Sequence, residues 1–320
     1  MIKVLHLFFA TTLLLIACIA PSAAVADQHK SILVTGASSG IGRNLTERLA
    51  ENGYHVYAGA RKDEDLAALN AIDNVTAVRL DVTKQDQIDA AVAMIRKQGT
   101  GLHGLVNNAG VGGGGPVMDT PVDQQTFVYN INVEGVYRIT QAFAPLVIES
   151  KGRIVTTGSI AGTLSPMTYS AYSGSKHWIE SFTDSLAAEM EPHGVWVSVV
   201  EPGSYKSKIR RNTAARMLEQ AQAAGGEVTA EMKENYAETA KRELSYKEPD
   251  EVSEAFMHAL FDDAPLRRYL VVPAADQQAA TIGKKIDELV ELNQWGPYKY
   301  SREELIGILD KALSGETAAE

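Results

Sequence analysis

From Ser31 onward, short apolar runs rich in β-branched residues alternate with stretches of helical periodicity. The runs that we expect to be strands are residues 32–35, 55–60, 75–80, 104–106, 153–157, 195–200 and 269–272. Most are continuously apolar, as strands buried on both faces of a parallel sheet require. Helical patterns fill the gaps, for example at residues 86–97. The alternation predicts βαβ crossovers and an α/β fold, a single doubly wound parallel sheet with helices on both faces.

The composition narrows the class of function. Hydrophobic residues make up 45% and charged residues 22% of the 320 residues, which is typical of a folded enzyme. The formal charge of −10 provides no basic surface for nucleic acid, so we expect a small molecule as the partner. The only cysteine is Cys18, near the N-terminus, so disulfides and thiolate metal sites are excluded from the folded part. The seven histidines lack a metal-binding spacing, and we expect no metal.

Residues 1–26 resemble a targeting segment. A short cationic start is followed by an almost wholly apolar run at 4–20 and by the small-x-small site Ala24-Val25-Ala26. This pattern predicts a cleaved secretory signal, and hence a periplasmic or secreted protein. Three alternatives stay open: an uncleaved anchor that associates the protein with a membrane, lipidation at Cys18, and a buried helix.

The remaining chain divides into a catalytic domain at 27–275 and a helical C-terminal extension at 276–320. Within the domain, residues 206–247 are polar and Ala/Glu-rich and follow a strand end, where this kind of sheet binds ligands. We expect them to form a lid over the substrate. In the extension, residues 282–292 have a helical pattern, and Ser301 with Glu304 forms a capping box that predicts another helix.

Two local patterns carry chemistry. The glycine-rich turn Thr35-Gly36-Ala37-Ser38-Ser39-Gly40-Ile41-Gly42 follows a strand and opens a helix, a context in which backbone N–H groups hold a pyrophosphate. Tyr172 and Lys176 are four residues apart and share one face of a helix. We expect the Lys176 charge to favour the ionised Tyr172 hydroxyl and so to lower its pKa from about 10, which suits proton transfer near neutral pH.

Five motifs in a fixed order resemble the short-chain dehydrogenase/reductase family over roughly residues 30–275. They are Thr35-Gly36-x-x-x-Gly40-Ile41-Gly42, Asn107-Asn108-Ala109-Gly110, Ser159, Tyr172-x-x-x-Lys176 and Pro202-Gly203. The stretch 179–208 is similar to the retinol and hydroxysteroid dehydrogenase branch. The resemblance implies a Rossmann-type fold and a nicotinamide-dependent enzyme that interconverts a carbonyl and an alcohol.

The resemblance also implies roles for individual residues. Tyr172 is the expected general acid/base, Lys176 its pKa-lowering partner and ribose ligand, and Ser159 the hydrogen-bond partner of the substrate oxygen. Asn132 corresponds to an asparagine that bends its helix and holds a relay water. The residues expected to bind the cofactor are Gly36, Ser38, Ser39, Gly40, Ile41, Gly42, Arg61, Lys62, Asp81, Val82, Asn108, Ala109, Gly110, Tyr172, Lys176, Pro202 and Gly203.

The end of the second expected strand bears on cofactor choice. An acidic side chain there would accept hydrogen bonds from the ribose of NAD, but Ala60 occupies that place. Arg61 follows and is positioned to pair with a 2′-phosphate. We therefore expect NADP(H) to be preferred, with NAD(H) as the alternative.

The substrate is expected to be lipophilic, a ketone or aldehyde or the corresponding secondary or primary alcohol. Leu164, Met167, Ile209 and Met217 are the candidate pocket residues, and Tyr169 is expected to line the pocket. Two other classes stay open, a nicotinamide-binding sensor or scaffold without turnover and an epimerase or dehydratase on the same fold. By analogy with the family, a homodimer or homotetramer would form through the helices that contain Asn132 and Tyr172.

Overall fold

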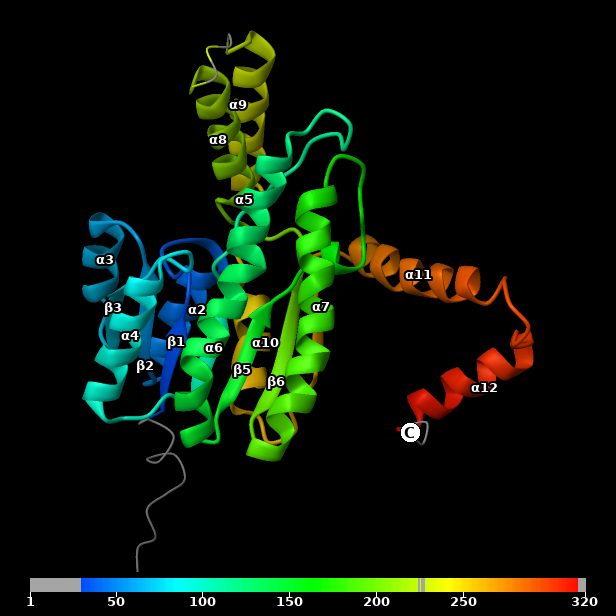
Figure 1. The fold of residues 1–320 in the computed structure, drawn as a ribbon, viewed down its shortest axis with the longest axis horizontal. Helices are drawn as coiled ribbons and strands as arrows, with labels where there is room; N and C mark the ends of the chain where they lie inside the picture. Colours follow the sequence, from blue (N-terminus) through cyan, green and yellow to red (C-terminus); the bar gives the residue numbers. More distant parts are fainter. Residues whose placement is uncertain (1–29, 224, 226–227, 316–320) are drawn as a thin grey trace, which may run out of the picture.

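The computed structural model describes residues 30–223, 225 and 228–315, and its centre is a seven-stranded sheet (Figure 1). The strands are β1 (Ser31–Val34), β2 (His55–Ala60), β3 (Val75–Arg79), β4 (Gly104–Asn107), β5 (Arg153–Thr157), β6 (Trp196–Pro202) and β7 (Arg268–Val271). All pairs are parallel, in the order β3-β2-β1-β4-β5-β6-β7. The predicted doubly wound sheet is confirmed, and the strand ends differ from expectation by one or two residues at most.

Helices cover both faces of this sheet (Figure 1). One face is covered by α2 (Gly40–Glu51), α3 (Asp63–Asn70) and α10 (Asp250–Phe261). The other is covered by α4 (Gln85–Gln98), α5 (Val122–Asn132), α6 (Glu134–Glu149) and α7 (Ser170–Met190). The helix expected at 86–97 is therefore confirmed as α4.

Alternation along each strand divides the core into two layers. In β1, Leu33 packs on the side of α4 and α6, whereas Ile32 and Val34 pack on the side of α2 and α10. Leu105 and Val106 of β4 divide in the same way. Because successive strand residues point to opposite faces, one uninterrupted apolar run supplies both layers.

Two helical segments extend from this body (Figure 1). α8 (Ile209–Ala223) and α9 (Ala230–Leu244) stand beyond the carboxyl ends of the strands, within the segment 206–247. α11 (Ala275–Leu292) and α12 (Arg302–Leu313) follow β7, and we call residues 275–315 the arm. The predicted capping box begins α12, since Ser301 Oγ accepts a hydrogen bond from Glu304 N and Glu304 Oε2 accepts one from Ser301 N.

The predicted targeting segment, residues 1–26 with Cys18, lies outside the described residues, so its cleavage, lipidation or anchoring stays a prediction. Within the described ranges, no helix combines the length and the apolar character needed to cross a membrane. The short helices η1 (Ile160–Gly162) and η2 (Glu191–His193) complete the secondary structure of the described part.

The strand order reverses between β1 and β4, and Thr35 joins the two loops that leave these strands. Its Oγ1 accepts hydrogen bonds from Asn108 N (2.9 Å) and Ala109 N (3.0 Å) and lies 3.2 Å from Val106 O. The Asn108 amide donates in return to Thr35 O (2.9 Å) and Gly36 O (3.2 Å). Ligands bind at such reversal points in doubly wound sheets, so these bonds fix the floor of the expected site.

We expect Thr35→Val to lower the free energy of unfolding by about 2 to 4 kcal/mol, because it keeps the shape but leaves two amides without their acceptor. Thr35 is 2% exposed, so water has little access to replace the hydroxyl. Urea unfolding followed by circular dichroism measures the change. Thr35→Ser is the matched control and should retain most of the stability, and an equal loss in both variants would contradict the assigned role of the hydroxyl.

Candidate active site

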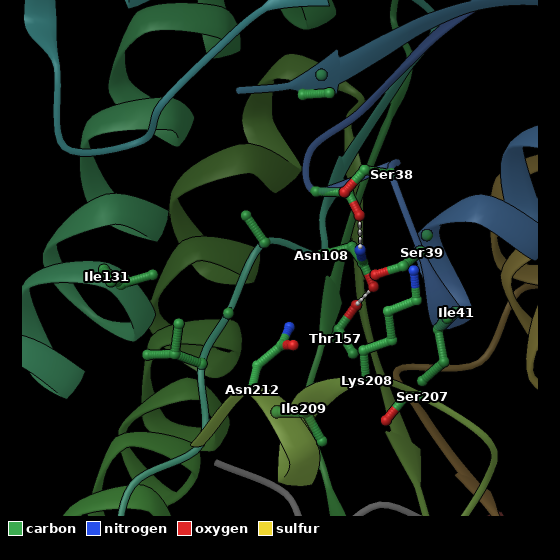
Figure 2. Close-up of a pocket in the computed structure, with 18 of the residues that line it drawn as sticks. Ser38, Ser39, Ile41, Asn108, Ile131, Thr157, Ser207, Lys208, Ile209 and Asn212 are labelled. Carbon is green, nitrogen blue, oxygen red and sulfur yellow. Dashed lines mark hydrogen bonds between the residues drawn. The ribbon is translucent and has the colours of Figure 1, made fainter. Parts of the chain in front are cut away.

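A cleft of about 560 Å³ opens at the carboxyl ends of the central strands. In Figure 2, Ser38, Ser39 and Asn108 lie on one side of it, and Ser207, Lys208 and Ile209 of the lid segment on the other. The predicted residues that line it are Gly36, Ser38, Ser39, Gly40, Ile41, Gly42, Arg61, Lys62, Asp81, Val82, Asn108, Ala109, Gly110, Ser159, Tyr172, Lys176, Pro202 and Gly203. Residues more than 160 positions apart in the chain are thus brought together as expected.

The glycine turn has the shape of a phosphate cradle. Gly36 and Gly40 have φ angles of +67° and +57°, in the left-handed region that favours glycine. A Cβ on Gly36 would lie 2.8 Å from Ala109 Cα, and one on Gly42 would collide with Asn108 and the Gly36 carbonyl. Ser39 is the N-cap of α2, and Gly40, Ile41 and Gly42 of its first turn, whose backbone N–H groups have no acceptor within the helix, line the cleft. These features fit a dinucleotide pyrophosphate.

At the other end of the cleft, three of the predicted catalytic side chains meet. Ser159 lies two residues after the end of β5 and caps η1, with its Oγ accepting a hydrogen bond from Ala161 N at 3.1 Å. Tyr172 and Lys176 lie on α7, and Lys176 Nζ is 5.8 Å from the centroid of the Tyr172 ring. Lys176 is 7% exposed, and its Nζ donates a 2.7 Å hydrogen bond to Thr157 O.

The expected lowering of the Tyr172 pKa by Lys176 is not found in this structure. Removal of the phenol from water raises the pKa of Tyr172 above its ordinary value, and a hydrogen bond with Ser159 and the charge of Arg210 only partly oppose this. Burial also lowers the pKa of Lys176 to about 8, against the charge of Glu180. The expectation was wrong because it considered the helical spacing and omitted desolvation, which outweighs it here.

Asn132 does not line the cleft. It is 1% exposed at the junction where α5 ends and α6 begins. Its amide nitrogen donates to Val111 O (2.9 Å) and Ser175 Oγ (3.0 Å), and its Oδ1 accepts from Val111 N (2.8 Å). Ser175 Oγ in turn donates to Tyr172 O at 2.7 Å. The Asn132 side chain therefore ties the Val111 loop to the turn of α7 that carries Tyr172.

The expected apolar substrate pocket is brought together only in part. Ile209 lines the main cleft, and Met217 lines a small neighbouring cavity beside Phe127 and Arg216. Leu164 and Met167 line neither, and Met167 is 89% exposed. Tyr169 was also expected to line the pocket, but it lines neither cavity, and its hydroxyl lies 3.3 Å from Arg210 Nη1.

The sequence interpretation missed several residues of the cleft. Lys208, Arg211 and Asn212 come from the start of the lid, and Thr157 from the end of β5. Their position after a strand end indicated that the segment 206–247 lies at the cleft. The sequence did not show which polar side chains of α8 turn toward the cleft, because polar and apolar residues are not separated onto opposite faces of this helix.

Two carboxyl groups lie behind Gly158, which lines the cleft. Glu201 on β6 is 7% exposed, and one oxygen of Glu180 on α7 is buried with no hydrogen-bond partner among the described residues. A Cβ on Gly158 would lie 3.2 Å from Glu180 Oε1 and 3.3 Å from Glu201 Cγ, so this glycine leaves room for both. Burial and the charge of Glu180 raise the pKa of Glu201 to about 7, with Arg268 and Lys285 acting in the opposite direction.

The raised pKa of Glu201 makes the folded protein less stable as pH rises. The folded protein binds the Glu201 proton more tightly than the unfolded chain, so the stabilisation is full below the unfolded pKa of 4.5 and is lost as pH rises through about 7. Between pH 5 and pH 8.5, we expect the free energy of unfolding of the unmodified protein to fall by roughly 2 to 3 kcal/mol more than that of Glu201→Gln, because the glutamine side chain does not titrate. Unfolding midpoints at the two pH values measure this, with the exposed Glu189→Gln as control. Equal losses in all three proteins would contradict the assignment.

Comparisons with known proteins agree with this geometry. The family model for short chain dehydrogenases matches residues 30–218. A 3β-hydroxysteroid dehydrogenase of Caenorhabditis elegans is 32% identical over 269 residues, which is 77% of this chain and 69% of the relative.

Two solved structures share the fold. A short chain dehydrogenase/reductase from Burkholderia phymatum in complex with NAD has a TM-score of 0.70 at 26% identity, over 85% of this chain and 98% of the other. An actinorhodin polyketide ketoreductase with NADPH has a TM-score of 0.64 at 28% identity, over 78% and 97%. The chain belongs to the short-chain dehydrogenase/reductase family and is an oxidoreductase that acts on hydroxyl or carbonyl groups with a nicotinamide nucleotide.

Proposed function

We propose that this protein is an NADP(H)-dependent oxidoreductase that interconverts a lipophilic carbonyl compound and its alcohol, with Tyr172 as the general acid/base. The observation that carries the proposal is that Ser159, Tyr172 and Lys176 line the same cleft as the glycine cradle. A dinucleotide held at the cradle would thus extend toward the hydroxyls. A sensor or scaffold without turnover has no need for such an arrangement.

The chemistry assigns a distinct task to each side chain. When bound, a nicotinamide nucleotide would supply the hydride for the carbonyl carbon or accept it from the alcohol. Tyr172 gives its proton to the substrate oxygen during reduction and takes it back during oxidation. Ser159 holds the same oxygen, so that orientation as well as proton transfer lowers the barrier. The raised pKa of Tyr172 keeps the phenol protonated in the cleft, which suits the reductive direction.

Lys176 and Asn132 support the tyrosine in different ways. Lys176 Nζ is fixed by the Thr157 carbonyl at the cleft wall, where its remaining N–H groups are available to ribose hydroxyls. Asn132 acts on Tyr172 through Ser175, whose hydroxyl donates to the Tyr172 carbonyl. The two residues thus position the ribose and the acid/base rather than react with the substrate.

Arg61 supports the choice of NADP(H). It lines the cleft just after β2, and its guanidinium has no ion-pair partner among the residues that the structure describes. By contrast, its neighbours are paired, since Lys62 lies 3.4 Å from Glu64 and Asp63 pairs with Arg79. A free guanidinium beside the adenosine end of the cleft suits a 2′-phosphate. Glu64 and Asp65 line the same end and oppose the preference.

The lipophilic substrate class rests on the lid side. Ile209 lines the main cleft and Met217 lines the smaller cavity, so the segment 206–247 contributes apolar surface to both. The similarity to a 3β-hydroxysteroid dehydrogenase supports the same class. A panel of steroid, retinoid and short-chain ketones assayed with NADPH tests it, and turnover confined to small polar sugars would contradict it.

We expect Tyr172→Phe to reduce kcat by about 10²- to 10⁴-fold, because it removes the proton donor and keeps the ring. The dissociation constant for NADPH, measured by the cofactor's fluorescence, should change little. Tyr169→Phe is the matched control, since this hydroxyl contacts Arg210 and lies outside the cleft lining. Substantial turnover by Tyr172→Phe would mean that another group transfers the proton.

We expect Arg61→Ala to weaken the preference for NADPH over NADH by about tenfold to a hundredfold, through the loss of a charge-assisted hydrogen bond of about 1.5 to 3 kcal/mol. The measurement is kcat/KM for both cofactors, with the NADH value as an internal reference. Arg96→Ala on α4, which removes an exposed ion pair with Glu149, is the control. An unchanged ratio in Arg61→Ala would remove the basis for the NADP(H) assignment.

A further inference from the structure

The helix α11 faces the body of the protein with its polar side. The residues of this polar stripe are Gln277, Thr281, Lys284 and Glu288, at spacings of four, three and four. Thr281 is 3% exposed, whereas the apolar Ile286 and Leu289 on the other side are 54% and 51% exposed. A surface helix normally buries its apolar side instead. This orientation places polar side chains against the residues that α11 contacts.

One of these side chains reaches the bend that follows β6. Gln277 Oε1 accepts a hydrogen bond of 2.9 Å from Ser204 N. A Cβ on Gly203 would collide with the same oxygen, and it would lie 3.0 Å from Val272 Cγ1 and 3.1 Å from Pro273 Cδ. The glycine at 203 therefore lets the first turn of α11 approach the bend closely enough for this hydrogen bond to form.

The bend 203–205 also borders the cofactor cleft. Gly203 and Tyr205 line the cleft, whereas Ser204 between them does not. Gln277 likewise lies outside the lining and contacts the bend through Ser204. The arm thus supports this part of the cleft from behind, and any cofactor that fills the cleft meets the other side of the same three residues.

Hydrogen bonds hold both ends of the bend as well. Gly203 N donates to Val271 O at 2.8 Å, and the Tyr205 hydroxyl donates to Glu251 Oε2 at 2.5 Å. Between these two anchors, the Gln277 side chain holds the Ser204 N–H. The lid segment 206–247 begins at the next residue along the chain. The position of the bend therefore depends on a side chain of the arm as well as on the sheet and α10.

A charge on α11 reaches a second part of the cleft wall. Lys285 lies eight residues after Gln277, about two helical turns further along. Burial raises the pKa values of Glu180 and Glu201, and the charge of Lys285 is among those that oppose this rise. Both carboxyl groups lie behind Gly158, which lines the cleft. The first part of the arm is thus linked to the cleft at two places.

We propose that Gln277 is a positioning residue for the nicotinamide nucleotide, because it holds the bend 203–205 where the bend can contact the bound cofactor. The inference rests on the proposed function in so far as the cleft binds such a nucleotide, and it is independent of the substrate. A bend that leaves this position is not competent to bind, and the apparent dissociation constant rises in inverse proportion to the competent population. One neutral hydrogen bond corresponds to about a twofold to tenfold change in such a population.

Gln277→Met tests the proposal, since it keeps the length of the side chain and removes the acceptor oxygen. We expect the dissociation constants for NADPH and NADH, measured by nucleotide fluorescence, to rise together by about threefold to tenfold. Their ratio should stay constant, because the 2′-phosphate is assigned to Arg61. The value of kcat at saturating NADPH should change by less than about twofold, because the hydroxyls of Ser159 and Tyr172 are retained.

Two further variants serve as controls. Gln278 is the next residue of α11 and is exposed, so Gln278→Met should leave both dissociation constants unchanged. Gln277→Glu keeps a side-chain oxygen that can accept from Ser204 N, and its dissociation constants should match those of the unmodified protein within about twofold. Equal weakening in Gln277→Glu and Gln277→Met would contradict the role assigned to this hydrogen bond.

Amide hydrogen exchange separates positioning of the bend from a purely structural role in α11. The amides of Gly203 and Tyr205 keep their own acceptors, Val271 O and Gly203 O, in Gln277→Met. Without nucleotide, they should nevertheless exchange about threefold to tenfold faster in this variant than in the unmodified protein, and saturating NADPH should remove the difference.

Faster exchange confined to α11, with dissociation constants equal to those of the unmodified protein, would overturn this inference alone. Failure of the unmodified protein to bind either nucleotide would overturn the proposed function together with it. The two failures are therefore distinguishable in the same titration.

Discussion

The structure depends on the hydrogen bonds that Thr35 makes where β1 and β4 diverge. At this position the sheet changes direction, and two loops that are more than 70 residues apart must lie in register before any cofactor can bind. The Thr35 hydroxyl and the Asn108 amide achieve this by bonding reciprocally to each other's backbone. The glycines then let the backbones approach closely enough for those bonds to form.

On the side of the cleft formed by α7 and β6, burial shifts the pKa values of the titratable side chains more than neighbouring charges do. Loss of contact with water favours the neutral form of three side chains here. It raises the pKa values of Tyr172 and Glu201 and lowers that of Lys176. A proton is therefore held tightly at Tyr172 and loosely at Lys176 in the protein alone. Charges near them modify this balance, with Arg210 acting on Tyr172 and Glu180 acting on Lys176. Burial at the cleft thus favours the protonated form of the Tyr172 phenol.

The sequence was sufficient for features that depend on local pattern. A short apolar run such as that of β1 indicates a strand buried on both faces, and the capping box at Ser301 needs only its own residues. Most residues that line the cleft were predictable because their motifs follow strand ends or, for Tyr172 and Lys176, lie near the start of α7. Features that depend on distant packing were not predictable. Tyr169 was expected to line the pocket, but its hydroxyl lies against Arg210, which is 41 residues away in the chain, and outside the cleft lining. Likewise, nothing local shows that α11 turns its polar stripe inward.

The central claim is that Tyr172 is the group that exchanges a proton with the substrate beside the bound dinucleotide. Ultraviolet difference titration of the unmodified protein against Tyr172→Phe, with and without NADP⁺, tests it most directly because it follows this phenolate alone. The account predicts that the Tyr172 signal appears at a higher pH than that of an exposed tyrosine in the protein alone, because burial raises its pKa, and at a lower pH when NADP⁺ is bound. A Tyr172 signal that NADP⁺ does not move would contradict it, since the phenol would then not face the cofactor.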